Sequence, residues 1–278
     1  MGRAAGSVGG VATYLDRILA AHRDAAARDT RSLTSVEAAA AAGPPVRGFR
    51  ARLSAVAADG DLAVIAEIKR RSPSLGDLAV GIDPAAVAAS YEAGGAACLS
   101  VLTDVSFFGG SPADLVAARS ATSLPVLRKD FTVGAADVFD ARAMGADAVL
   151  LIAAALSDEL LASLHALARS LGMDALVEVH DGAEVDRALA VGANLIGVNQ
   201  RDLVTFAVDT ERALQVASSI PDGVIRVAES GIDGPAAAAR LAGAGYDAVL
   251  VGETLMRAAD RSAAVAELRT ALRRMSAT

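Results

Sequence analysis

The sequence predicts an α/β protein, a (β/α)8 TIM barrel with an N-terminal helical extension. Two observations predict it: short apolar runs alternate with Ala-rich helical stretches from residue 62 onward, and Gly stands at many joints between a helix and the next run. Continuously apolar runs are typical of parallel strands buried on both faces. A doubly wound open sheet is the structural alternative. No GxGxxG follows the first run, so a dinucleotide site has little support.

The first 60 residues predict the helical extension, and we expect residues 1–278 to form a single barrel domain. Residues 12–29 and 35–42 carry apolar side chains at helical spacing. A GPP segment then interrupts the pattern, and FRARLSA, which follows it, predicts another helical turn. The extension would therefore end where the first apolar run begins.

Eight apolar runs predict the strands, in chain order. They are AVIAEIK (63–69), ACLSVLT (97–103), LPVLRKD (124–130), AVLLIA (148–153), ALVEVH (175–180), LIGVNQ (195–200), IRVAES (225–230) and AVLVGE (248–253). The joints AGGAA, MGADA, VGANL and AGYDA suit helix C-caps and αβ turns. Eight βα units in about 200 residues favour a closed barrel.

Composition and charge exclude several classes of partner. The net charge is −7 and no basic block appears, so we expect no nucleic acid partner. The longest apolar run, 148–156, falls short of the roughly 20 residues that cross a bilayer, and the first ten residues lack the apolar core of a signal peptide. Cys98 is the single cysteine, which predicts a buried thiol. We expect a cytoplasmic protein without a membrane partner, a monomer with no obligate protein partner.

Lysine is rare in this chain: of 26 basic residues, only Lys69 and Lys129 are lysine, and the others are arginine. A coding bias that replaced surface Lys by Arg is the plain explanation. It makes the two exceptions informative, because the pKa of a lysine can be moved into a working range and that of an arginine cannot. Both lysines are therefore candidates for proton transfer.

In a barrel, the functional side chains lie at the carboxyl ends of the strands. Those ends carry Glu67, Lys69, Thr103, Lys129, Asp130, Glu178, Asn199, Arg201, Glu229, Ser230 and Gly252. Because strand side chains alternate with a period of two, Glu67 and Lys69 face the same side. Inside the barrel they would form a desolvated pair in which each charge tunes the pKa of the other. The alternative is a buried pair that only neutralises itself.

Two further carboxylates extend this set. Glu178 lies between apolar neighbours in ALVEVH, and Glu229 is comparable in RVAESG. A buried carboxylate needs a partner, which Lys69 or Lys129 could provide from across the barrel. Three carboxylates and two ammonium groups at strand ends make a general acid/base set.

The last two strands run into glycine, at Gly231 in ESGIDG and Gly252 in VGETLMR. Glycine there lets backbone N–H groups approach a ligand, at the position where many barrels bind phosphate. Ordinary tight turns are the alternative. The pattern indicates a phosphorylated ligand.

The histidines predict no metal site. We expect His22 and His165 on helix surfaces and His180 in a loop, too scattered to share an ion. No GxSxG occurs, so a Ser–His–Asp triad has no support.

Eight segments, one around each predicted strand, match a known family in order: AEIKRRSPS, LTDVSFFGGS, LPVLRKDF, DAVLLI, LVEVH, GVNQRDL, VAESGI and VGETLMR. The chain resembles the indole-3-glycerol phosphate synthase family, a barrel enzyme of tryptophan biosynthesis, and its helical extension is similar too. The family, a decarboxylating lyase, converts 1-(2-carboxyphenylamino)-1-deoxyribulose 5-phosphate to indole-3-glycerol phosphate by ring closure, decarboxylation and dehydration. The resemblance implies that activity, a small phosphorylated substrate, and neither cofactor nor metal.

The resemblance also implies catalytic roles. Lys129 would be the general acid of the condensation, and Glu178 with Lys69 would serve the dehydration, with Glu178 as the base. Glu67 would hold and tune the lysines. Asn199 would hydrogen-bond to the reacting hydroxyl, and Glu229 would support the lysines. Which of Lys69 and Glu178 is the acid stays open from sequence.

The implied binding residues surround this set. The aryl ring would lie among Ser72, Pro73, Phe108 and Phe131, and Arg201 would orient the substrate. Phosphate would meet backbone N–H groups at Ser230, Gly231, Gly252 and Glu253. The family often has a small polar residue where Glu253 stands, so its side chain must point away. Gln200 stands where the family usually has Asn or Ser.

Two other functions stay open at this point. Another phosphosugar barrel, an isomerase or an aldolase with a Lys129 Schiff base, is the nearest rival. A non-catalytic phosphate-binding barrel would keep Gly231 and Gly252 but could lose Lys129 and Glu178, and this chain has both.

Overall fold

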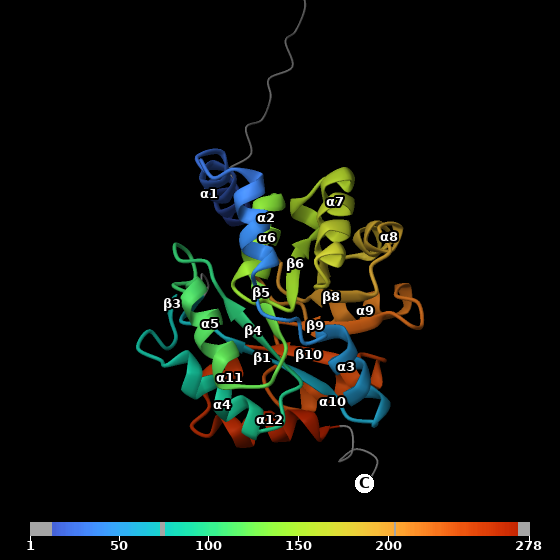
Figure 1. Ribbon diagram of the computed structural model, residues 1–278. Helices are drawn as coiled ribbons and strands as arrows, with labels where there is room; N and C mark the ends of the chain where they lie inside the picture. The colour runs from blue at the N-terminus through green and yellow to red at the C-terminus, as the bar shows by residue number, and fades with distance from the viewer. Residues whose placement is uncertain (1–12, 73–75, 203, 272–278) are drawn as a thin grey trace, which may run out of the picture.

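The computed structural model describes residues 13–72, 76–202 and 204–271, which contain a closed barrel of eight parallel strands (Figure 1). The strands are β1 (Ala63–Ile68), β4 (Cys98–Leu102), β5 (Val126–Lys129), β6 (Ala148–Ile152), β7 (Asp174–Val179), β8 (Leu195–Asn199), β9 (Ile225–Glu229) and β10 (Ala248–Val251). Each pairs with its neighbours in chain order, and β10 closes the barrel on β1. The barrel prediction is confirmed, and every strand lies within two residues of its predicted bounds.

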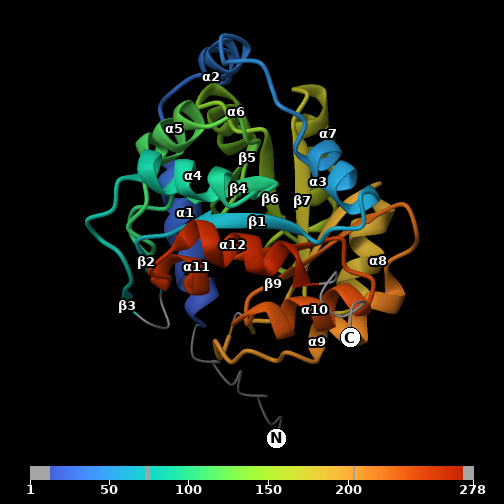
Figure 2. The same cartoon turned by 90° about the horizontal axis from the view of Figure 1, so that it is seen from below.

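Helices enclose the strands on the outside (Figure 2). They are α4 (Pro84–Ala93), α5 (Pro112–Ala121), α6 (Ala135–Ala143), α7 (Asp158–Ser170), α8 (Gly182–Ala190), α9 (Arg212–Val216), α10 (Pro235–Gly243), α11 (Glu253–Arg257) and α12 (Arg261–Arg269), with 3-10 turns at η1 (Ala153–Ala155) and η2 (Ala217–Ser219). Side chains such as Ser111, Ser157 and Asp181 cap the exposed N–H groups of their first turns. Within the described ranges, every helix is too short or too polar to span a membrane.

The strands are buried almost throughout, as parallel strands covered by helices must be. Their Val, Ile and Leu side chains pack against the helices and against each other across the barrel interior. Cys98 lies in this core, where burial raises the pKa of its thiol well above the usual range. Its expected buried state is confirmed, and a thiol in that state is unreactive.

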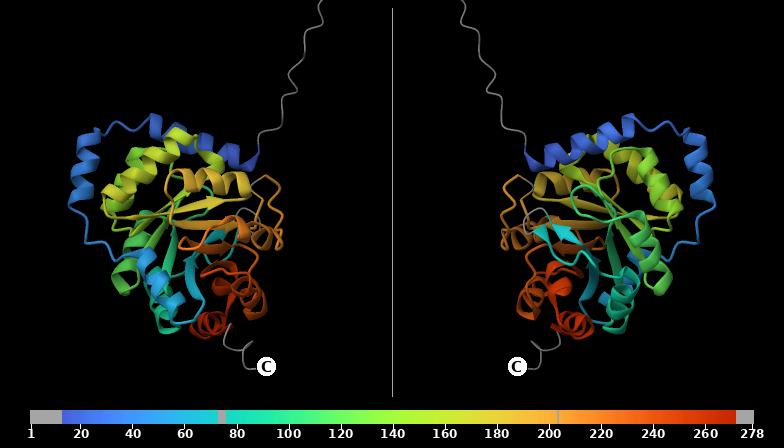
Figure 3. Two further views of the ribbon diagram at one scale, coloured as in Figure 1. Left: turned by 90° about the vertical axis from the view of Figure 1, so that its right-hand side faces the viewer. Right: turned by 90° about the vertical axis from the view of Figure 1, so that its left-hand side faces the viewer.

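The N-terminal extension follows the outside of the barrel from one end to the other (Figure 3). Helix α1 (Tyr14–Ala27) lies at the carboxyl ends of the strands, where three of its side chains line the pocket described below. Helix α2 (Leu33–Ala41) packs against α6. Helix α3 (Phe49–Ala58) lies near the amino ends, and its fully buried Phe49 and Leu53 belong to the core.

One small element was not predicted. Shortly after β1, the antiparallel strands β2 (Arg71–Ser72) and β3 (Gly76–Asp77) form a two-stranded sheet. The Arg71 guanidinium lies 2.8 Å from the Asp77 carboxylate across it. A pair of two-residue strands is too short for a periodicity to reveal.

At the amino ends of the strands, Asp147 fixes the extension to the barrel. Its carboxylate accepts hydrogen bonds from the backbone N–H groups of Arg47 and Val126, each at 2.7 Å, and from the Arg119 guanidinium at 3.2 Å. Asp147 is almost completely buried.

We expect Asp147→Asn to lower the free energy of unfolding by about 2 to 3 kcal/mol, because an amide NH2 would then face one of two buried backbone donors. Urea unfolding followed by circular dichroism measures this. The exposed Asp222→Asn is the matched control and should leave stability unchanged. Equal midpoints for the two variants would show that Asp147 does not anchor the extension.

Candidate active site

A pocket of about 470 Å³ opens at the carboxyl ends of the strands. That volume suits a small-molecule ligand. Four ionisable side chains reach it from alternate strands around the barrel: Glu67 from β1, Lys129 from β5, Glu178 from β7 and Glu229 from β9. In TIM barrels, interior side chains from alternate strands form a layer. This layer therefore consists of charged groups.

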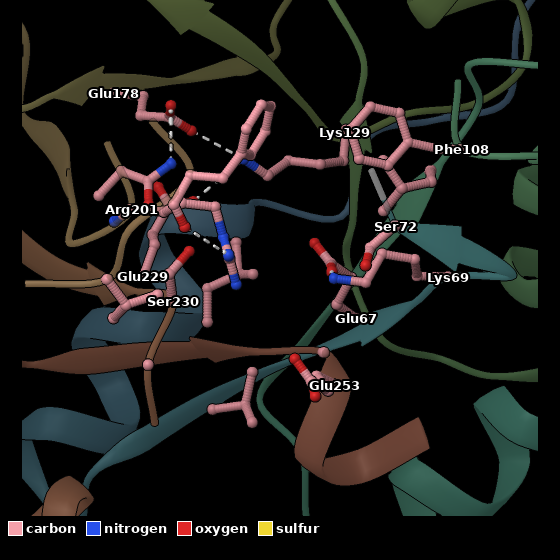
Figure 4. Close-up of a pocket in the computed structure, with 18 of the residues that line it drawn as sticks. Glu67, Lys69, Ser72, Phe108, Lys129, Glu178, Arg201, Glu229, Ser230 and Glu253 are labelled. Carbon is pink, nitrogen blue, oxygen red and sulfur yellow. Dashed lines mark hydrogen bonds and ion pairs between the residues drawn. The ribbon is translucent and has the colours of Figure 1, made fainter. Parts of the chain in front are cut away.

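Lys129 is the centre of this layer (Figure 4). Its ammonium nitrogen lies 2.8 Å from Glu178 Oε2 and 3.0 Å from Glu229 Oε2. The two glutamates are almost completely buried. A buried charge is tolerated only with a partner, so the three groups depend on one another.

The buried environment moves the pKa of each group differently. Burial alone would lower the pKa of Lys129, but Glu178, Glu229 and Glu67 hold it above its usual range. Burial would likewise raise the pKa of Glu178, yet the charges of Lys129 and His180 and two hydrogen bonds keep it below its usual value. Burial raises the pKa of Glu229 to about 7, against the opposing charge of Lys129. At neutral pH Lys129 is therefore an ammonium ion, Glu178 is an ionised carboxylate, and Glu229 is near the midpoint of its titration.

A second ion pair faces this cluster. Lys69 Nζ lies 2.7 Å from Glu67 Oε1, and the Lys69 side chain is only 16% exposed. Figure 4 shows the pair on the opposite side of the pocket from Glu178 and Glu229. Both lysines of the chain therefore line one pocket at one end of the barrel. Gly252 makes room for the pair, because a Cβ there would overlap Glu67 Oε1.

Asn199 and Gly197, both on β8, complete the carboxylate environment. The Asn199 side-chain amide donates to Glu178 Oε1 at 3.1 Å, and its oxygen accepts from the backbone N–H of Arg201 at 3.0 Å. Gly197 pairs in register with Glu178. A Cβ at Gly197 would overlap Glu229 Oε1, so this glycine gives Glu229 its place.

The predicted aryl wall lines the same pocket. Ser72 and the Phe108 and Phe131 rings face it, and the two ring centroids lie 6.2 Å apart. Pro73, the fourth predicted residue, lies outside the described residues.

The predicted phosphate residues also line the pocket. Ser230 and Gly231 take consecutive positive φ angles of 67° and 68°. This conformation is strained for a serine and common at functional sites. Gly252 and Glu253 line the pocket at the start of α11, and the Glu253 carboxylate lies 3.5 Å from Arg257 Nε, one turn later.

Arg201 extends along the pocket from the loop after β8. Its guanidinium donates to the Phe206 carbonyl at 3.0 Å. It thus lies beside the catalytic candidates while its far end is held by the loop.

Sequence reasoning missed the roof of the pocket. Tyr14, Leu15 and Ile18 of α1 line it. The Tyr14 ring packs edge-on against Phe206, with centroids 4.9 Å apart, and against Phe107 at 5.8 Å. The available signal was Tyr14 itself, one of three tyrosines in the chain, placed among small helix-forming residues.

The expectations for two histidines were wrong. His165 lies on the buried face of α7 and is not exposed on the helix surface. His22 faces the barrel, with Nε2 2.9 Å from Asp104 Oδ2 and 3.8 Å from Asp130 Oδ1. The amphipathic pattern of α1 did not reveal that its polar face meets these acidic loops.

His22, Asp104 and Asp130 are close enough to share a cation, since their ligand atoms lie within 4.8 Å of one another. Both carboxylates are, however, engaged by protein donors. Asp104 accepts from two backbone N–H groups, and Asp130 accepts from Arg128 at 2.9 Å and from Thr103. The nearby guanidinium disfavours a cation, so the cluster is better described as an attachment of α1.

Comparison with known proteins decides among the phosphate-binding barrels. The sequence model of one family, described as indole-3-glycerol phosphate synthase, matches residues 15–268. The chain belongs to the indole-3-glycerol phosphate synthase family. A protein of that name from Mycobacterium avium (strain 104) is 52% identical over 262 residues, which cover 94% of this chain and 95% of that one. The namesakes from Mycobacterium leprae and Mycobacterium tuberculosis are 52% and 51% identical, over the same shares of both chains.

Solved structures agree on the fold. A thiamine phosphate pyrophosphorylase from Pyrococcus furiosus superposes with a TM-score of 0.57 at 18% identity, covering 77% of this chain and 96% of that one. A 3-hexulose-6-phosphate synthase superposes with a TM-score of 0.59 at 18% identity, covering 76% and 100%. At such identity these likenesses show the barrel alone, whereas the indole-3-glycerol phosphate synthase relatives cover 94% of this chain at 51–52% identity.

We expect the free energy of unfolding of Glu229→Gln, measured relative to that of the wild type, to rise with pH. The pKa of Glu229 is about 7 in the fold and about 4.3 in an unfolded chain. Between those values the folded protein binds the extra proton, so wild-type stability falls as pH rises through this window. Glutamine cannot ionise. The stability difference between variant and wild type should therefore grow by about 2 kcal/mol from pH 5 to pH 7.5.

Urea unfolding at each pH measures this difference. The exposed Glu267→Gln on α12 is the matched control and should show no such pH dependence. A constant difference for Glu229→Gln would mean that Glu229 is ionised at all these pH values.

Proposed function

We propose that this chain closes the indole ring of indole-3-glycerol phosphate from 1-(2-carboxyphenylamino)-1-deoxyribulose 5-phosphate, with loss of CO2 and water. One observation carries the proposal beyond family membership. Lys129, a protonated amine, lies between two buried carboxylates at 2.8 and 3.0 Å, and a second ammonium group faces them in the same pocket. The reaction needs proton donors at two separate moments, and the pocket has two lysines.

Lys129 fits the general acid of the condensation. As the aryl carbon attacks the C2′ carbonyl carbon, the carbonyl oxygen gains negative charge and takes a proton. Because the pKa of Lys129 is raised by its three carboxylate neighbours, the amine carries that proton at neutral pH. Departure of CO2 then returns its bonding electron pair to the ring. The protonated oxygen remains as a hydroxyl group.

Glu178 and Lys69 fit the dehydration that follows. The hydroxyl group leaves as water after it receives a proton, and a base removes a proton from the ring. Glu178, whose pKa is lowered, is ionised and suits the base. Lys69, held by Glu67, suits the donor. Asn199 is held against Glu178 and is placed to hydrogen-bond the leaving hydroxyl.

The pocket walls suit the rest of the substrate. Backbone N–H groups around Ser230–Gly231 and Gly252–Glu253 would bind the phosphate, with the Glu253 carboxylate drawn toward Arg257. Phe108 and Phe131 would hold the aryl ring, together with Ser72 and Pro73. Arg201 would orient the substrate by its charge. These roles need neither a cofactor nor a metal.

The proposed reaction also bears on the substrate class, the location and the partners of the protein. The substrate is a small phosphorylated molecule, and the expected location is the cytoplasm. We keep the expectation of a monomer that needs no protein, membrane or nucleic acid partner for turnover.

An aldolase mechanism is the remaining enzymatic rival. A Schiff-base lysine must be a neutral amine to attack a carbonyl. The pKa of Lys129 moves in the opposite direction, which disfavours that role. Borohydride trapping with a sugar phosphate would label an aldolase lysine and should leave Lys129 unlabelled.

We expect Lys129→Ala and Glu178→Gln each to lower kcat by at least about 100-fold, the usual contribution of a general acid or base. Binding of the product, measured by calorimetry, should persist because its phosphate contacts are untouched. The chain has no tryptophan, so indole fluorescence reports turnover against a low background.

The exposed Glu159→Gln on α7 is the control and should keep wild-type turnover. Near-normal turnover by Lys129→Ala or Glu178→Gln would overturn the assignment of that residue. A wild type that makes no indole product would overturn the proposed function itself.

A further inference from the structure

His180 is the strongest feature that the mechanism above does not use. It follows β7 directly, two residues after Glu178, so its side chain points to the same side of the strand. Its Nε2 lies 3.8 Å from Glu178 Oε1. That nitrogen is buried and has no hydrogen-bond partner among the residues that the structure describes.

The other ring nitrogen fixes the protonation state. His180 Nδ1 lies 3.0 Å from Glu184 Oε2, which also accepts from the His180 backbone N–H at 2.8 Å. A carboxylate accepts, so Nδ1 carries a proton. A neutral ring would then present an Nε2 lone pair to the Glu178 carboxylate, acceptor against acceptor. Only the imidazolium ion presents an N–H group to both carboxylates.

The charges around the His180 ring also favour its imidazolium form. Burial would lower the pKa of His180, but its hydrogen bond to Glu184 and the charges of Glu178 and Glu184 raise it above its usual value. Arg212 of α9 is the opposing cation near the ring. His180, held by Glu184, thus places a positive charge beside the Glu178 oxygen that Lys129 does not contact. Lys129 contacts Oε2, and His180 faces Oε1.

We propose that His180, held by Glu184, is a positioning residue that remains an imidazolium ion and keeps the Glu178 carboxylate ionised while Lys129 gives up its proton. This inference rests on the proposed function. Once Lys129 has protonated the substrate it is a neutral amine, and Glu178 has lost its main cation. Glu178 must nevertheless be a base in the dehydration. The His180 cation is not consumed by either step, so it supplies the charge that Lys129 withdraws.

Nuclear magnetic resonance of the imidazole nitrogens tests the charge coupling without turnover. The chain has three histidines, so His→Asn variants assign each signal. We expect His180 in the wild type to titrate above the usual pKa of about 6.5. Glu178→Gln and Glu184→Gln should each lower that pKa by about 1 unit, the smaller end of the effect of a nearby opposite charge. A His180 that titrates at or below the usual value, or that ignores Glu178→Gln, would overturn the proposal.

The pH profile of turnover tests its consequence. In His180→Asn the acid limb of kcat should move upward by about 1 pH unit, so that kcat falls up to about tenfold on the acid side of the wild-type limb and recovers at higher pH. KM should stay within twofold. His180→Lys should restore the wild-type limb, since it restores the cation, and the buried His165→Asn should not move the limb.

Glu184→Gln gives the same measurement if His180→Asn fails to fold. A loss of kcat equal at all pH values would show that His180 supports structure only and would refute the inference. The proposed function and the proposed role of His180 would be refuted by different results. A wild type without indole product refutes the proposed function, whereas an active wild type with unshifted variants refutes the role of His180.

Discussion

The contact on which the site depends is the Lys129 ammonium group between Glu178 and Glu229. These side chains and Glu67 come from alternate strands, so no segment of the chain contains them and only barrel closure brings them together. Removal of one partner from such a buried set leaves an uncompensated charge, which costs several kcal/mol, about 3 to 5 in measured cases. The fold and the charged layer therefore stabilise each other. The raised pKa of Glu229 shows that the charge of Lys129 does not fully offset the cost of burying this carboxylate.

Glycines on the intervening strands make this layer possible. Gly197 on β8 gives space to Glu229, and Gly252 after β10 gives space to Glu67. A methyl group at either position would overlap an oxygen of the glutamate and so displace its carboxylate group from the neighbouring lysine. Large charged groups on alternate strands and glycine between them follow the packing rule of barrel interiors, in which side chains from neighbouring strands share limited volume.

The strands and the strand-end residues could be predicted from sequence because both are local. An apolar run specifies a buried strand, and a period of two specifies that Glu67 and Lys69 share a face. What covers an element is not local. The roof formed by Tyr14, the burial of His165 and the approach of His180 to Glu178 depend on which neighbour packs where, and no periodicity records that.

The negative charge of the layer has a consequence for the proposed reaction. Glu67, Glu178 and Glu229 of the layer lie in the same pocket as two ammonium groups, and the substrate brings a phosphate and a carboxylate of its own. Backbone N–H groups can hold the phosphate, which is unchanged by the chemistry. Tight binding of the substrate carboxylate would stabilise the ground state and oppose its loss as CO2. A site with excess carboxylate meets this requirement, because repulsion there is relieved when CO2 leaves.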